Sequence, residues 1–183
     1  MWMMLRVIPI MWRAVRPSRV VDMPAVVNTF WLPKGYEGLT FFGHILAPTQ
    51  ELADRFNSAP CVAASPGVAA DLQSAALKNH EMIHLRQAQA CGDSWLHFYL
   101  LYIWYWAKNR VSLTFCSGGS AIRRQMKHAA YLLNPFEIEA YARMNDLNYL
   151  KGDCKSPATA TEWRRYAKMP LKERLRLYRK DVV

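Results

Sequence analysis

Apolar residues recur at helical spacing between Trp95 and Ala107, the most hydrophobic stretch of the chain. Those at i, i+3, i+4, i+7, i+8 and i+11 share one face of an α-helix: Trp95, Phe98, Tyr99, Tyr102, Ile103 and Trp106. Leu, Trp and Tyr cover the other sides as well. The pattern therefore predicts a helix that lies buried at the centre of the fold. A second interpretation is an aromatic element at a membrane surface, assisted by basic chain ends.

The segment before the aromatic helix also has a helical composition. Residues 71–90 are strong helix formers without Pro or Gly. Gly92 follows as a stop, since glycine is favoured just after a helix end, and Ser94 can cap the aromatic helix. We therefore expect two consecutive helices joined by a short turn.

The second half of the chain contains three more helical segments. One covers residues 121–133 and is broken by Asn134 and Pro135, which serve as N-cap and first position of the next helix. A basic amphipathic helix covers residues 161–180 and is interrupted at Pro170. The second half is thus predicted to be helical throughout, apart from its connections.

A small sheet is expected only near the N-terminus. Residues 30–32 read as a strand, 33–38 as a turn rich in Pro and Gly, and 39–46 as a second strand. Residues 57–68 are typical of a loop. The predicted fold class is α+β, mostly helical with a small N-terminal sheet or hairpin.

The net charge of +10 is concentrated at the two ends of the 183-residue chain. Residues 1–19 carry an excess of +4 and residues 155–183 an excess of +6, whereas residues 20–154 hold 11 basic and 11 acidic side chains. This split argues against a nucleic-acid-binding domain with a basic face throughout. It predicts a neutral domain between a basic apolar N-terminal segment and a basic, helical C-terminal tail. Those ends could bind an anionic surface or a protein partner.

Composition and cysteine spacing narrow the class of protein further. Hydrophobic residues make up 52% and charged residues 21%, which fits a globular domain and excludes wholesale disorder. The four cysteines form no CxxC pair, which argues against a zinc ribbon and mildly favours a reducing compartment: Cys61, Cys91, Cys116 and Cys154. The longest apolar run has about 13 residues, too few to span a bilayer, and the N-terminus lacks the order of a secretory signal. We expect a cytoplasmic protein without a transmembrane segment, with peripheral membrane association as an option.

The chemistry of the chain is concentrated in an HExxH motif within the first predicted helix. His80 and His84 stand four residues apart, so both imidazoles project from one helix face and can bind one Zn²⁺ ion. Glu81 lies between them and can act as general base towards a water molecule activated by the metal. The motif predicts a catalytic zinc site, provided that a third ligand is present.

Several residues could supply the third ligand. His97 and His128 are possible, but a lone histidine on such a helix more often packs or faces solvent. Glu137 is the first choice and Glu139 the second, because both lie at the start of the helix after Asn134. The alternative interpretation of Glu137 is structural, since it occupies the position at which a glutamate completes a capping box with Asn134.

The sequences LKNHEMIHLRQ, FYLLYIWYW and AYLLNPFEIEAYA, taken in this order, resemble small bacterial HExxH proteins regarded as zinc metallopeptidases with a minimal zincin core. The resemblance spans residues 40–145. The segment of residues 137–141 is similar to the gluzincin arrangement, in which a later helix presents a glutamate ligand in an ExxA pattern followed by a polar residue. The resemblance implies that His80, His84 and Glu137 bind zinc and that Glu81 is the catalytic base.

Other residues near the motif carry weaker predictions. Gln87 lies one turn after the second histidine and could bond a ligand or a substrate, or be polar surface. Tyr131 or Tyr141 could donate a hydrogen bond to a tetrahedral oxyanion, and Tyr141 is the one that we assign. Asn79 could orient the start of the active-site helix or have no role.

The leading functional hypothesis is a zinc-dependent metallohydrolase that acts on a peptide or protein substrate. The alternative is a catalytically silent structural or interaction module that docks through its basic, aromatic ends. A site closed by a fourth protein ligand would favour that alternative. A third hypothesis is attachment to a membrane or nucleic acid through the ends, which requires strongly salt-dependent binding that is lost when residues 155–183 are deleted.

Overall fold

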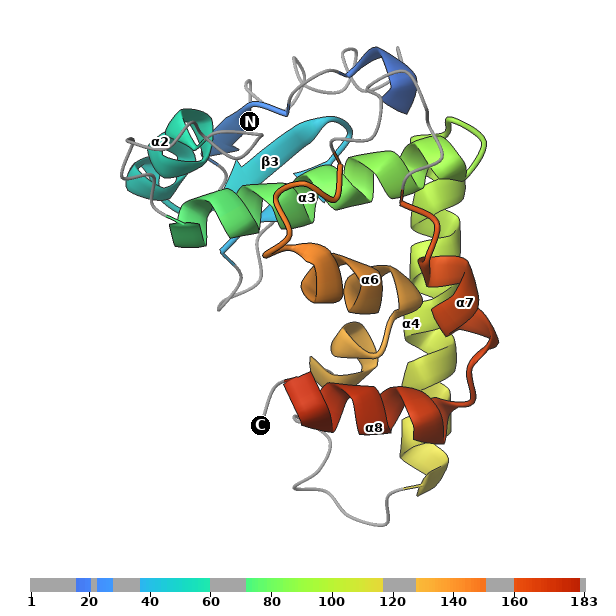
Figure 1. Cartoon of the computed structure of the whole chain (residues 1–183). Coiled ribbons are helices and arrows are strands. Elements are labelled where there is room, and N and C mark those ends of the chain that lie inside the picture. Colours follow the sequence, from blue (N-terminus) through green and yellow to red (C-terminus); the bar gives the residue numbers. More distant parts are fainter. Residues whose placement is uncertain are drawn as a thin grey trace, which may run out of the picture.

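The computed structural model describes residues 16–20, 23–27, 37–59, 72–116, 128–150 and 160–181. Within these ranges the protein is mostly helical with one small sheet, which confirms the α+β class (Figure 1). The elements are the 3₁₀ turn η1 (Pro17–Arg19), strands β1 (Ala25–Val27), β2 (Leu39–Phe41) and β3 (His44–Ala47), and helices α2 (Gln50–Ser58), α3 (Leu72–Ala90), α4 (Trp95–Cys116), α6 (Pro135–Arg143), α7 (Trp163–Lys168) and α8 (Leu171–Asp181). Residues 128–132 are also helical.

The sheet has the strand order β1-β3-β2, with β1 parallel and β2 antiparallel to β3. The prediction of one strand over residues 39–46 is wrong, because the chain reverses at Phe42 and Gly43, whose φ angles are 46° and 87°. Two successive positive φ angles make a tight hairpin turn, which glycine adopts freely and Phe42 does not. Tyr99 supports this turn by accepting a hydrogen bond from the Phe42 amide, 3.0 Å. The strand predicted at residues 30–32 lies outside the described residues.

Helix α2 was not anticipated from the pattern. Thr49 caps it, since its hydroxyl accepts a hydrogen bond from the Leu52 amide, and its inner face buries Ala53 and Phe56. The loop predicted at residues 57–68 is wrong at its start, because residues 57 and 58 complete this helix. The rest of that loop, from residue 60, lies outside the described residues. Helix α2 packs against β1, β3 and α3.

The central helix is α3 rather than the aromatic helix α4. Most residues of α3 are buried, and it contacts η1, β2, α2, α4 and α6 (Figure 1). The prediction that α4 is buried all round is wrong, since only one face of α4 packs on the core, through Trp95 and Phe98, while Leu96 and Trp104 are 65% and 63% exposed. Periodicity alone cannot show how many sides of an apolar helix have neighbours. The turn between the helices is as predicted: Gly92 has a φ of 78°, and the Ser94 hydroxyl accepts from the His97 amide.

Helices α6 and α7 complete the core beside α3. Asn134 caps α6 by accepting from the Phe136 amide, and Pro135 takes the first position, as predicted. The Trp163 ring of α7 lies 4.5 Å from the Phe136 ring, so the core extends into the segment that the sequence separates as a basic tail. The predicted interruption at Pro170 is confirmed, because it separates α7 from α8.

Candidate metal centre

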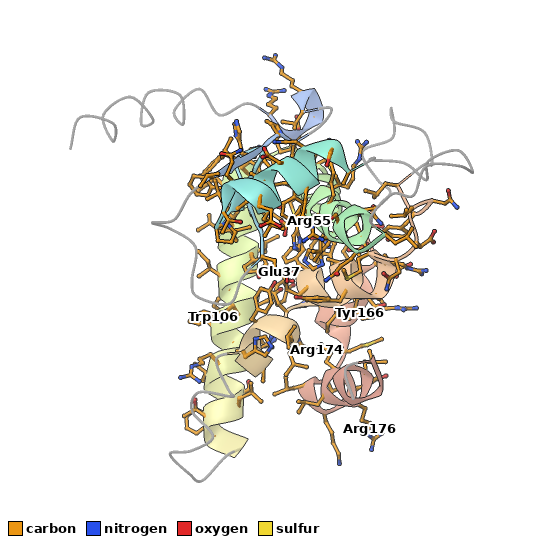
Figure 2. The ribbon with its side chains drawn as sticks, turned by 90° about the vertical axis from the view of Figure 1, so that its left-hand side faces the viewer. Glu37, Arg55, Trp106, Tyr166, Arg174 and Arg176 are labelled. Carbon is orange, nitrogen blue, oxygen red and sulfur yellow. The ribbon has the colours of Figure 1, made fainter. Side chains whose placement is uncertain are left out.

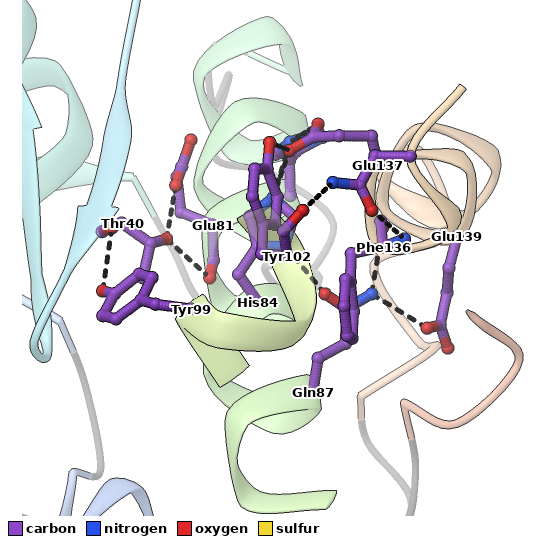
Figure 3. Close-up of polar contacts among 11 residues, drawn as sticks. Thr40, Glu81, His84, Gln87, Tyr99, Tyr102, Phe136, Glu137 and Glu139 are labelled. Atoms are coloured by element: carbon purple, nitrogen blue, oxygen red, sulfur yellow. Dashed lines mark hydrogen bonds and ion pairs between the residues drawn. The ribbon is translucent and has the colours of Figure 1, made fainter. Parts of the chain in front are cut away.

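Helices α3 and α6 bring two histidines and one glutamate together in the interior (Figure 3). The Nε2 atoms of His80 and His84 lie 3.2 Å apart. Glu137 places Oε2 3.3 Å from the Nε2 of His80 and Oε1 3.3 Å from the Nε2 of His84. All three side chains are buried, Glu137 with 2% of its surface exposed. The three residues that the sequence nominates as ligands therefore meet at one point.

The two histidine nitrogens have the spacing of two ligands of a tetrahedral metal ion, and each Glu137 oxygen has that spacing to one of them. Bonds of about 2.0–2.1 Å, as zinc makes to nitrogen and oxygen, leave ligand atoms about 3.3 Å apart. The Oε2 of Glu137 is also buried without a hydrogen bond of acceptable geometry, although His80 lies nearby. A buried carboxylate oxygen without a donor is costly unless another positive group satisfies it. Two imidazoles and this carboxylate are ligands that Zn²⁺ accepts.

A second layer of hydrogen bonds fixes the orientation of His84. Its Nδ1 lies 2.8 Å from the Oε1 of Gln87, an amide oxygen that can only accept. In the neutral ring the proton is thereby held at Nδ1, which leaves the lone pair of Nε2 for a metal ion. Gln87 is held in turn by donating to Glu139, 2.8 Å, and to the Phe136 carbonyl, 3.0 Å. Gln87 is thus a buried positioning residue and not polar surface.

Glu139, the second choice for the third ligand, faces away from the histidines. Its carboxylate is fully buried and accepts hydrogen bonds from Gln87, from the Tyr149 hydroxyl and from the Glu162 and Trp163 amides at the start of α7. A carboxylate with four donors has its lone pairs engaged, and a helix N-terminus favours its negative charge. Glu139 therefore joins α3, α6 and α7, while Glu137 alone of the two reaches the histidines.

The capping-box interpretation of Glu137 does not hold in the structure. In that arrangement its carboxylate would accept from the Asn134 amide. The Asn134 amide instead donates to the Tyr131 carbonyl, 2.8 Å, and Glu137 turns towards His84 and the Tyr102 hydroxyl, which donates to it at 2.6 Å. Asn134 still caps α6 through its side chain. Glu137 therefore does not cap helix α6.

The charges of the cluster are coupled. Burial alone would lower the pKa of His84, but the carboxylate of Glu137 outweighs it and raises that pKa to about 9. Burial alone would raise the pKa of Glu137, but His84 and His80 hold it well below its usual range. Glu137 is therefore anionic near neutral pH, the form in which a carboxylate binds a metal ion.

Glu81 lies beside this cluster in a pocket of about 440 Å³, open mouth included. The Thr40 hydroxyl of β2 donates to its Oε2 at 2.5 Å (Figure 3). Gly38 approaches the other oxygen so closely that an added Cβ would lie 3.2 Å from Oε1. His84, Glu137 and Tyr102 line the same pocket. The carboxylate thus has a fixed direction, set by a strand that comes about 40 residues earlier in the chain.

The tyrosines nominated as oxyanion donors lie at the edge of the cluster. The Tyr141 ring packs edge-on against His80 with centroids 4.6 Å apart, and it is 43% exposed. Tyr131 lines the pocket and shares a side-chain hydrogen bond with Tyr141. Burial, together with the charge of Glu137, raises the pKa of Tyr131, so this phenol stays protonated and can donate. The role of Tyr141 stays a prediction, with Tyr131 nearer to the pocket.

The remaining nominated residues lie elsewhere. His97 is exposed near Gly92, and His128 is exposed and stacks on Tyr131. Within the described ranges neither belongs to a group that could hold a metal ion. The Asn79 side chain donates to three carbonyls at the end of α6, those of Arg143, Met144 and Asp146, so it joins α3 to α6.

Sequence reasoning missed Thr40, Gly38 and Tyr102. Thr40 and Gly38 carry no local signal, because their relation to Glu81 depends on how β2 lies against α3. Tyr102 was noted only as part of an apolar stripe. A phenol facing the buried side of a helix needs a polar partner, and that requirement was a usable signal.

No family model, no curated protein and no solved structure matches the chain. The resemblance to zincin-like metallopeptidases therefore stays a prediction, and a functional proposal has to rest on the geometry of the cluster.

Proposed function

We propose that the protein is a zinc-dependent metallohydrolase that cleaves peptide bonds, with zinc bound by His80, His84 and Glu137. The observation that carries the proposal is the buried group of two histidine nitrogens 3.2 Å apart and one carboxylate, each of whose oxygens lies 3.3 Å from one of the nitrogens. Zinc is favoured over harder cations because two of the three ligands are imidazoles.

The side chains around the cluster have the chemistry of a hydrolase. A zinc ion held there would act as a Lewis acid and lower the pKa of bound water to about 7. Glu81 then accepts a proton from the attacking water and returns it to the leaving amine. The hydrogen bond from Thr40 fixes the orientation of the Glu81 carboxylate. Tyr131, kept protonated, or Tyr141 donates to the oxyanion.

A peptide is the substrate class that the pocket favours. Among the described strands β2 lies at one edge of the sheet, and its residues Leu39 and Thr40, together with Gly38 before them, line the pocket beside Glu81. An extended peptide can pair with an exposed strand edge through its main chain, which suits a substrate recognised by its backbone. Aromatic side chains of α4 line the same pocket and offer apolar contact to a substrate side chain.

The alternative, a silent structural or interaction module, is less well supported. Structural zinc sites are closed by four protein ligands, whereas catalytic sites have three and an open position. Among the residues that the structure describes, the cluster has three members and adjoins a pocket. This open arrangement favours catalysis over a purely structural metal.

Metal binding is tested with a matched pair of variants, Glu137→Gln and Glu139→Gln. Both residues are buried glutamates of α6, two positions apart, but only Glu137 faces the histidines. Purified wild type should contain one zinc ion per chain by mass spectrometry of metals. Glu137→Gln should lose it, whereas Glu139→Gln should retain it and lose stability. Absence of zinc from wild type purified without chelators refutes the proposal.

Catalysis is tested separately with Glu81→Gln. This variant keeps an oxygen that can accept from Thr40 but loses the basic carboxylate. We expect unchanged zinc content and a fall in peptide hydrolysis of about a hundredfold or more, the scale of general-base catalysis. An exposed glutamate substituted in the same way, Glu51→Gln, is the control for a general effect of charge. Undiminished hydrolysis in Glu81→Gln removes this residue from the mechanism.

A further inference from the structure

The outward side of α4 exposes a stripe of large apolar side chains, and the helix has no acidic residue. Its large side chains are 56–86% exposed: Leu96, Leu100, Ile103, Trp104, Val111 and Phe115. The opposite side packs on the core through Trp95 and Phe98, each 2% exposed. Isolated exposed apolar residues are common, but a stripe along one helix marks a site of interaction. We call these six residues the outer face of α4.

Two basic side chains border the outer face. With 100° between successive residues, Lys108 lies about 80° to one side of the centre of the stripe and Arg110 about 80° to the other. Both can extend their aliphatic stems along the apolar stripe and bring the charge to a polar layer above it. Figure 2 shows Trp106 of α4 on the side of the helix away from α7 and α8.

We infer that the outer face of α4 binds the surface of an anionic lipid bilayer. An apolar stripe with tryptophan and a basic border is the arrangement of helices that lie in the membrane interface. Helix α4 carries Lys108 and Arg110 and no acidic residue, so the charge beside the stripe complements anionic headgroups. A second copy of this chain would bring the same positive borders together. None of the described helices is long and apolar enough to cross a membrane, so the helix lies along the surface.

The proposal is independent of the metal centre, although both use α4. The side chains of α4 that reach the pocket, Phe98, Tyr99 and Tyr102, lie on its inward side. Variants of the outer face should therefore leave zinc binding unchanged. Zinc content thus serves as a control for correct folding and separates failure of this inference from failure of the proposed function.

The test is cosedimentation of the full-length protein with vesicles of phosphatidylglycerol and phosphatidylcholine, compared with phosphatidylcholine alone. We expect binding only to the anionic vesicles. Leu100→Glu combined with Trp104→Glu should lower the partition coefficient at least tenfold, with zinc content and circular dichroism unchanged. Lys108→Gln should lower it about fivefold, the effect of one cation near an anionic surface. Leu72→Glu is the control, because Leu72 is 74% exposed but lies on α3, outside the outer face. This variant should lose only the small part of the binding that one added negative charge removes.

Three outcomes overturn the inference. If the variant with two glutamates binds anionic vesicles as tightly as wild type, the basic chain ends and not α4 hold the membrane. If wild type fails to bind vesicles but forms a dimer that Leu100→Glu dissociates, the outer face joins two copies. If wild type neither binds vesicles nor dimerises, and the protein binds vesicles only after residues 1–15 are deleted, that segment is what covers the outer face of α4.

Insertion of the face itself is measured by fluorescence quenching with brominated lipids. Trp104 is 63% exposed at the middle of the stripe. Wild type on anionic vesicles should be quenched, and Trp104→Phe should lose part of that quenching while binding equally well. Equal quenching in both proteins means that the outer face does not enter the bilayer and contradicts the inference.

Discussion

Replacement of Gln87 by leucine should weaken zinc binding, although Gln87 is not itself a ligand. The side chain is fully buried and has three partners, the ring of His84, the carboxylate of Glu139 and the carbonyl of Phe136. Leucine has a similar size but can neither accept from His84 nor donate to the other two. The ring of His84 then loses the bond that fixes its proton at Nδ1.

The size of the effect can be worked out from these contacts. Loss of a partner that orients a metal-binding histidine typically lowers metal affinity by 10–100-fold, or about 1.4–2.7 kcal/mol. The stability of the metal-free protein should fall as well, by about 2–4 kcal/mol, because buried Glu139 loses one of its four donors and the buried Phe136 carbonyl loses the Gln87 amide. Gln89→Leu is the matched control. Gln89 is another buried glutamine of α3, but it bonds Pro17 and Arg86, away from the cluster.

The two effects are separated by measuring affinity on folded protein. Zinc affinity is obtained by competition with a chromogenic chelator, at a temperature where circular dichroism shows both variants folded. Free energies of unfolding come from urea titrations of the metal-free proteins. We expect both variants to lose stability and only Gln87→Leu to lose affinity. Equal zinc affinity in Gln87→Leu and Gln89→Leu would refute the role given to the Gln87 amide.

Three other predictions concern the cluster and its surroundings. Because the pKa of His84 is raised to about 9, its charge pair with Glu137 should stabilise the metal-free protein fully just below pH 6.5 and be lost as the pH rises through 9. In acid the pair is lost again, because Glu137, whose pKa is lowered from 4.5, becomes protonated. Zinc must displace the proton of His84, so affinity in a pH series of titrations should rise about tenfold per pH unit up to pH 9; an affinity that does not change with pH would contradict the raised pKa. Gly38→Ala should reduce hydrolysis more than zinc content, because the new Cβ would lie 3.2 Å from the Oε1 of Glu81; equal losses of both would count against a specific effect on Glu81. Burial raises the pKa of the Cys91 thiol to about 11, so alkylation of Cys91 at pH 8 should be far slower in the folded protein than in the unfolded protein. Mass spectrometry measures the extent of alkylation, and rapid labelling of the folded protein would contradict this prediction.

Helix α3 could be predicted because the signals that define it are local. Residues 71–90 have helical composition, Gly92 ends the helix, and the spacing of His80 and His84 places both on one face whatever the rest of the fold does. The structure agrees on each of these points. The spacing of two residues along one helix fixes the angle between their side-chain directions, so this prediction does not depend on the packing of other elements.

The choice between Glu137 and Glu139 could not be made from local spacing. Two residues apart on one helix, they point about 200° apart, so only one of them can face the histidines of α3. Which one does so depends on the packing of α6 on α3 and on α7, whose first amides bind Glu139. The segment that carries those amides comes more than 20 residues later. The same reason explains why Thr40, from β2, could not be assigned to Glu81.

The prediction of a buried α4 was wrong because apolar character shows what a helix can bury, not what surrounds it. The helix buries Trp95 and Phe98 and leaves Leu96 and Trp104 exposed. A polar helix took the central position instead. The hydrophobic pattern would not have chosen α3, because its buried residues include charged and amide side chains.

The central position of α3 is possible because its buried polar groups have partners in different elements. Lys78 donates to the carbonyl of Ala59 after α2, Asn79 to the end of α6, Glu81 accepts from β2, and Gln89 donates to η1. An unpaired buried polar group would cost about 1–3 kcal/mol, so each contact also selects the arrangement of its neighbour. The Oε2 of Glu137 has the His80 ring nearby but no hydrogen bond of acceptable geometry, and it lies where the metal is proposed. Zinc would complete this set of contacts, and at a thousandfold excess over its dissociation constant it should stabilise the fold by about 4 kcal/mol. The proposed metal centre therefore lies in the core that holds the helices together, and if zinc is bound there, its removal should lower the melting temperature of the whole domain.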